Sequence, residues 1–174
     1  MKTRLKFILL SIAIATAFFP LIRFVLMKPY LILIGSIVSA LGGILPYGKA
    51  VLSERVVAGT GEIAFDLFKY RKTILVDAAS IITNLVPLIA LVLATPVKWI
   101  KRTIGAGIGI GILMISHILA ISVILIWQTS PSGESIEGFK IFIDGILIFA
   151  LPLLYWAVWA DKAYQTGLQG IFKS

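Results

Sequence analysis

The chain lacks cysteine altogether and has one histidine, His117, among its 174 residues. These absences exclude thiol catalysis, disulfides, iron–sulfur clusters and the sites that need paired histidines, such as many zinc and haem centres. We therefore expect no metal site. No cofactor follows from the residues that are present, and a lipid is the one small ligand that the composition suggests.

Charged residues are also scarce, at 14% of the chain against 59% hydrophobic residues. Soluble domains are about 45–50% apolar, and a chain of this size could not bury so large an excess in a core of its own. A bilayer solvates such segments, provided that the backbone forms its own hydrogen bonds. The net charge of +8 resides mostly in short loops, where bases meet lipid phosphates, so we do not expect nucleic acid as a partner.

The hydrophobic runs predict an all-α, polytopic integral membrane protein with about five transmembrane helices, forming one membrane domain over residues 1–174. The predicted spans cover residues 7–27, 29–46, 74–97, 103–127 and 141–160. Between the second and third, the polar segment 47–73 contains Ile63, Phe65 and Leu67 beside Asp66 and Lys69, which favours a short interfacial helix. A solvated loop is the alternative. Basic residues divide almost evenly between the two predicted faces, so the orientation stays open.

Alternating glycines open the fourth predicted span, at Gly105, Gly107, Gly109 and Gly111. They are similar to a phosphate-binding loop only superficially, because no Lys-Ser or Lys-Thr pair follows and the segment is apolar. Small residues at a spacing of four let two membrane helices approach closely. We therefore expect these glycines to serve helix packing.

Polar side chains within spans are costly, which makes His117 and the group Asp77, Ser80 and Asn84 the candidates for a site. The spacing in that group would place its members on one face of a helix. They could line a polar cavity or ligand site, or they could join helices by hydrogen bonds. A lone histidine without a second ligand is more typical of a packing residue, and the second alternative is favoured for all four.

From about residue 31 to 123, the layout resembles that of the exosortase and archaeosortase family. The resemblance is carried by Val76-Asp77-Ala78-Ala79-Ser80 and by Ser116-His117-Ile118-Leu119-Ala120-Ile121, with an apolar helix and a basic turn between them. It implies a membrane-embedded cysteine transpeptidase that processes carboxy-terminal sorting signals in the cytoplasmic membrane of a prokaryote. The decisive residues differ, because Ala79 replaces the cysteine, Ile81 the glycine, His117 the asparagine and Ala120 the arginine. None of these replacements supplies a nucleophile or an arginine to stabilise developing charge.

Three functions are compatible with this pattern. We favour a non-catalytic membrane subunit, possessing no catalytic residues, that packs against lipid and other membrane subunits. The first alternative is an exosortase-like transpeptidase whose nucleophile has been replaced. The second is a small transporter or channel in which Asp77, Asn84 and His117 would line a path.

Overall fold

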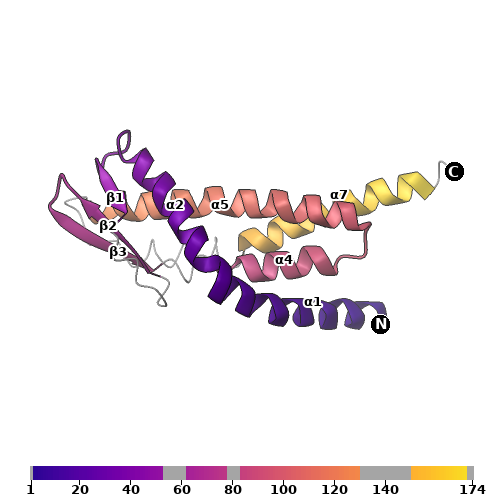
Figure 1. The fold of residues 1–174 in the computed structure, drawn as a ribbon. Coiled ribbons are helices and arrows are strands. Elements are labelled where there is room, and N and C mark those ends of the chain that lie inside the picture. The colour runs from indigo at the N-terminus through magenta and orange to yellow at the C-terminus, as the bar shows by residue number, and fades with distance from the viewer. Residues whose placement is uncertain (1, 53–61, 78–82, 130–149, 172–174) are drawn as a thin grey trace.

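In a computed structural model, the structure describes residues 2–52, 62–77, 83–129 and 150–171, with side chains described from residue 5 to residue 163. Helices α1, α4, α5 and α7 lie side by side along one axis, and a small sheet closes one end of them (Figure 1). The amino terminus lies at the opposite end from the sheet. Helix α2 crosses obliquely over α5 and packs on the sheet.

One continuous helical run extends from Lys2 to Leu41, so the separate spans predicted over 7–27 and 29–46 are wrong. Helix α1 (Lys2–Pro20) leads into the π-helical segment η1 (Leu21–Leu26), and α2 (Met27–Leu41) follows directly. Pro20 and Pro29 each remove an N–H donor from the helical ladder. Between these prolines the helix changes from hydrogen bonds that span four residues to bonds that span five, as when the Met27 amide donates to the Ile22 carbonyl. The helix therefore continues instead of ending.

The segment predicted as an interfacial helix forms an antiparallel sheet instead. Strands β1 (Ala50–Leu52), β2 (Glu62–Leu67) and β3 (Lys72–Asp77) pair in the order β1-β2-β3. Ile63, Phe65 and Leu67 are buried at every second position, and Phe65 lies opposite Ile74 across the β2–β3 pair. These three large side chains recur with the period of a strand, and the small Ala64 between them is buried as well.

The span predicted over 74–97 is also wrong. Its first residues belong to β3, and α4 (Leu85–Ala94) is only 10 residues long. Ten residues of helix rise about 15 Å, half the thickness of a hydrocarbon core. Thr95 ends α4 in an extended conformation, as expected for a residue that precedes a proline, here Pro96.

Helix α5 (Trp99–Thr129) packs against α2, α4, α7 and β3, and it includes the whole span predicted over 103–127. A methyl group at Gly105 would overlap the Trp159 indole, and one at Gly109 would lie 2.7 Å from the Tyr155 ring. Both aromatic residues belong to α7 (Leu151–Ile171), which covers the described end of the span predicted over 141–160. The close packing expected of the glycines therefore occurs at two of the four.

Among the residues that the structure describes, two helices, not about five, are long and apolar enough to cross a membrane. They are the run Leu5–Leu41 and the helix Trp99–Thr129. The all-α architecture is likewise corrected by the three-stranded sheet. The spans predicted over 7–27 and 29–46 fall on one bent helix, and the span predicted over 74–97 joins a strand to a short helix. Residues 141–149 of the fifth predicted span lie outside the described residues.

The glycines of α5 provide a matched test of this packing. We expect Gly105→Ala to lower stability by about 1–3 kcal/mol, because the methyl group must displace the Trp159 ring. Gly107→Ala should leave stability unchanged or raise it by up to about 1 kcal/mol, since the new methyl group meets no described atom within 4 Å and alanine favours the helix. Unfolding of both variants in detergent would be followed by circular dichroism. Equal effects at the two positions would contradict the α5–α7 contact.

Candidate functional site

The only histidine of the chain is enclosed where three segments meet. His117 is fully buried on α5, and both of its ring nitrogens have hydrogen-bond partners. Nδ1 lies 2.7 Å from the hydroxyl of Tyr30 on α2. Nε2 lies 3.1 Å from the side-chain oxygen of Asn84, the residue that precedes α4.

The partners determine which nitrogen carries the proton. The Asn84 oxygen can only accept a hydrogen bond, so Nε2–H of His117 donates to it. In the neutral imidazole Nδ1 is then an acceptor, and the Tyr30 hydroxyl donates to it. The three residues thus form one directed chain of hydrogen bonds that joins α2, α4 and α5, which we call the Tyr30–His117–Asn84 link.

Local structure places each member of the link. Tyr30 comes one residue after Pro29, just beyond the π-helical segment, where its ring meets that of His117 edge to face at a centroid distance of 5.8 Å. Asn84 occupies the N-cap position of α4, and its carboxamide oxygen bonds to the imidazole rather than to the amides of its own helix. Buried polar groups cost free energy unless they are paired, and this arrangement pairs both nitrogens of the imidazole.

The structure brings together two of the four residues named from the sequence. Asn84 and His117 are in contact, whereas Asp77 ends β3, is exposed, and lies opposite Glu62 in the sheet. The helical face expected to join Asp77 to Asn84 does not exist, because a strand has a different side-chain period. Ser80 lies outside the described residues, as does Ala79.

Tyr30 is the member of the site that sequence reasoning missed. The sequence offered one indication of its role, which is that a hydroxyl-bearing aromatic residue stands inside an apolar segment. Tyr30 lies 87 residues from His117 in the chain. Ala120, one turn beyond His117 on α5, is 3% exposed. An arginine at position 120, as the exosortase resemblance would require, would have to enter a packed interior.

A second polar cluster holds the opposite end of the helical body, where α4 turns into α5. Arg102 donates to the carbonyls of Leu93 and Val97, at 2.8 and 2.9 Å, and so satisfies groups that the end of α4 leaves unpaired. From α7, the Trp156 indole donates to the Thr95 hydroxyl at 2.9 Å. This cluster fixes α4, α5 and α7 relative to one another.

Neither cluster has the composition of a catalytic or metal centre. Within the part of the chain that the structure describes, no three His, Cys, Asp or Glu residues gather in a group that could hold a metal ion. The hydroxyl of Tyr30 is engaged by His117, and the imidazole is engaged at both nitrogens. What the Tyr30–His117–Asn84 link can do chemically is hold three helical segments in a fixed register.

Comparison with known proteins gives no match to any protein-family model, to any curated protein or to any solved structure. The resemblance to exosortases therefore stays a prediction from the layout of the sequence. Function has to be argued from the geometry of the chain itself.

The link predicts energetic coupling between residues far apart in the sequence. Asn84→Leu should lower stability by about 1–3 kcal/mol, because the buried Nε2–H of His117 loses its acceptor. A double-mutant cycle of Tyr30→Phe with His117→Leu should show a coupling of about 0.6–2 kcal/mol, the range measured for hydrogen bonds between membrane helices.

Thermal unfolding in detergent would measure both effects. Ser116→Ala is the matched control, since the Ser116 hydroxyl bonds to the Ile112 carbonyl of its own helix. Additive effects of Tyr30→Phe and His117→Leu would show that the hydrogen bond between them does not contribute to the fold.

Proposed function

We propose that this chain is an integral membrane protein in which the helical body lies in the bilayer and the sheet lies outside it. We further propose that it acts as a non-catalytic subunit of a membrane complex. The observation on which this rests is a band of exposed apolar side chains around the helical body. The sheet and its β2–β3 turn also expose apolar side chains, such as Phe68 and Leu75, but there they lie beside exposed charged residues such as Lys69.

The band is clearest on α5. Ile100, Ile104, Ile108, Ile115 and Leu119 are each more than half exposed and recur at spacings of four or seven residues along one face. From Leu119 to the end of the helix, no further large apolar side chain is exposed. At a rise of about 1.5 Å per residue, Ile100 and Leu119 are about 28 Å apart, which matches a hydrocarbon core of about 30 Å. Soluble monomeric proteins rarely expose so large a contiguous apolar surface to water.

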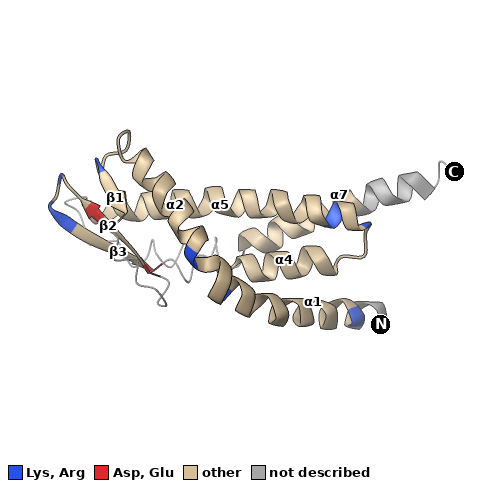
Figure 2. Ribbon diagram, viewed as in Figure 1, with Lys and Arg blue, Asp and Glu red and all other residues tan. Residues whose placement is uncertain are grey.

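On the first helical run, basic residues lie near the start of the band and at the bend, and exposed apolar residues continue beyond the bend to Leu33. Lys6 lies near the free end of α1, Arg23 and Lys28 lie at its bend, and the apolar residues between them include Ile8, Ile12 and Phe19. Figure 2 shows Lys and Arg at both ends of the helical body and at this bend, with the described Asp and Glu of the sheet beyond it. Basic residues at the ends of a span can extend their ammonium or guanidinium groups to the lipid headgroups.

A non-catalytic role is supported by the use that the fold makes of its polar residues. Both nitrogens of His117 serve contacts between helices, and Arg102 serves the end of α4. A catalytic base or acid needs an ionisable atom that reaches a substrate. A degenerate exosortase-like protein is the narrower form of this proposal, since His117 and Ala120 lie one turn apart on α5, with neither supplying the family chemistry.

A role as a subunit is supported by two glycines of α5 that the described part of the chain does not use for packing. Gly107 and Gly111 lie four residues apart, and a methyl group on either would meet no described atom within 4 Å. They lie among the exposed isoleucines of the band. Small residues at this spacing let the backbone of a second membrane helix approach closely, which lipid alone does not require.

The absence of cysteine makes the topology directly testable. Single cysteines would be introduced by Lys69→Cys in the β2–β3 turn, Lys98→Cys before α5, and Ile108→Cys in the band, all at exposed positions. In sealed vesicles, a membrane-impermeant maleimide should label only one of the first two, and the other only after permeabilisation. Ile108→Cys should react only after denaturation. Labelling of all three in sealed vesicles would contradict a spanning arrangement.

The subunit role is tested by purification from the native membrane in a mild detergent. We expect partner chains to remain attached to the natural protein and to be lost from Gly107→Leu, because the leucine side chain would block close approach of another helix. Leucine is compatible with lipid, so insertion should be unaffected. Ile108→Leu, on the same face, should retain the partners. A natural protein that purifies alone would refute the subunit role without affecting the topology.

A further inference from the structure

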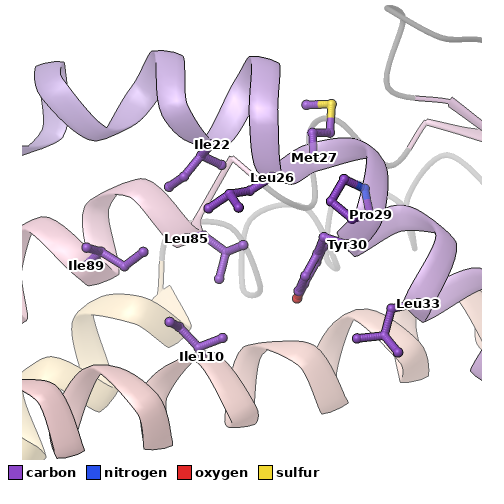
Figure 3. Close-up of a pocket in the computed structure, with 9 residues that line it drawn as sticks. All are labelled: Ile22, Leu26, Met27, Pro29, Tyr30, Leu33, Leu85, Ile89 and Ile110. Atoms are coloured by element: carbon purple, nitrogen blue, oxygen red, sulfur yellow. The ribbon is translucent and has the colours of Figure 1, made fainter.

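A pocket opens beside the Tyr30–His117–Asn84 link. It has a volume of about 310 Å³ and lies between η1, the first turns of α2, and helices α4 and α5 (Figure 3). Its lining is aliphatic except for Met27 and Tyr30, and comprises Ile22, Leu26, Met27, Pro29, Tyr30, Leu33, Leu85, Ile89 and Ile110. This volume is at the lower end of the range for small-molecule sites, which is about 300–1,000 Å³.

The pocket connects the apolar band with the interior. Leu26 and Leu33 at its rim are almost half exposed, whereas Ile22 and Leu85 belong to the buried core. Bends in helices have identifiable causes, and here the π-helical segment between Pro20 and Pro29 turns α2 away from the line of α1. The pocket lies at this bend.

Water is a poor occupant of this space. An ordered water needs two to four polar partners. Among the described residues of the lining, Tyr30 has the one polar side-chain group, and its hydroxyl already donates to His117. An empty apolar space of this size would forfeit dispersion contacts along its walls. An apolar chain restores those contacts without requiring a hydrogen bond.

Basic residues beside the pocket indicate which kind of lipid would supply the apolar chain. Lys28 is exposed and immediately precedes Pro29 and Tyr30, and Arg23 follows Ile22 one turn earlier. The helical run from Leu5 to Leu41 contains no acidic residue. A cation next to an apolar pocket that opens toward the exposed apolar band is complementary to a lipid with a negatively charged phosphate.

We infer that this pocket takes one acyl chain of an anionic phospholipid, with the Lys28 ammonium bound to the phosphate. The inference rests on the proposed insertion of the helical body in a membrane. In this arrangement the bend at η1 opens a gap between α2 and α4, and a lipid tail fits into that gap.

Native mass spectrometry of the full chain in detergent tests this, with equimolar phosphatidylglycerol and phosphatidylcholine as probes. We expect one tightly held lipid per chain, with phosphatidylglycerol preferred about fivefold, the contribution of one basic residue at an anionic surface. Lys28→Gln should abolish the preference. Lys6→Gln, which removes a cation at the far end of the band, should retain it.

Filling the pocket tests the site of the tail. Ile110→Trp should reduce the retained lipid several-fold, because the indole would occupy the space. Ile108→Trp, two residues away on the exposed face of the same helix, should retain it. Equal retention in the two tryptophan variants would overturn the proposal, provided that both melt within a few degrees of the natural protein. If Ile110→Trp unfolds, Ile110→Phe takes its place in the comparison.

Two further outcomes are distinguishable. Displacement of phosphatidylglycerol by equimolar oleate would assign the pocket to a free fatty acid and overturn the phospholipid assignment. Cysteine labelling that shows a spanning chain, together with no retained lipid, would refute the pocket while leaving the membrane topology intact. Labelling of all three cysteines in sealed vesicles would instead refute the topology itself.

Discussion

The hydrogen bonds of His117 are the interaction on which the arrangement of the helices depends. In an apolar body, side-chain packing alone leaves helices free to slide or rotate, because one aliphatic contact is nearly equivalent to the next. The contacts of a buried imidazole cannot replace one another in this way, because a ring nitrogen that loses its hydrogen-bond partner costs free energy. By binding Tyr30 at one nitrogen and Asn84 at the other, it sets the register of α2 and α4 against α5.

Around this link the chain divides into two environments. Toward the amino terminus, the helices expose large apolar side chains and are joined by aromatic contacts, such as the stacking of Phe7 on Trp156. Toward the sheet, α5 becomes more enclosed, and the charged turn between β2 and β3 follows. Tyr47, fully buried at this end, donates to the carbonyl of Val38 and ties the chain after α2 back to that helix. Burial raises the pKa of the Tyr47 phenol, so it stays protonated at neutral pH and keeps this donor.

The same α5 helix presents two kinds of small-residue face. Gly105 and Gly109 are used within the chain, where they allow Trp159 and Tyr155 of α7 to approach. Gly107 and Gly111 face away from those contacts. Alternating glycines thus give one helix the capacity for close contact on two sides, and the described residues of the chain occupy one of them. The bend at η1 has a comparable double effect, since it places Tyr30 against His117 and leaves an apolar pocket beside it.

Local composition determined much about this protein. The apolar excess, the lack of thiol chemistry, the glycine packing on α5 and the choice of Asn84 and His117 as residues of interest all follow from residue types and short spacings. Tertiary structure alone decided the rest. A short apolar run such as Ile74 to Val76 fits a strand or a helix equally well, and only pairing with β2 makes it a strand. Pro29 could have ended a helix, and the widened register at η1 lets the helix continue. Tyr30 became part of a site because folding brought it to His117 across 87 residues, a contact that no local pattern encodes.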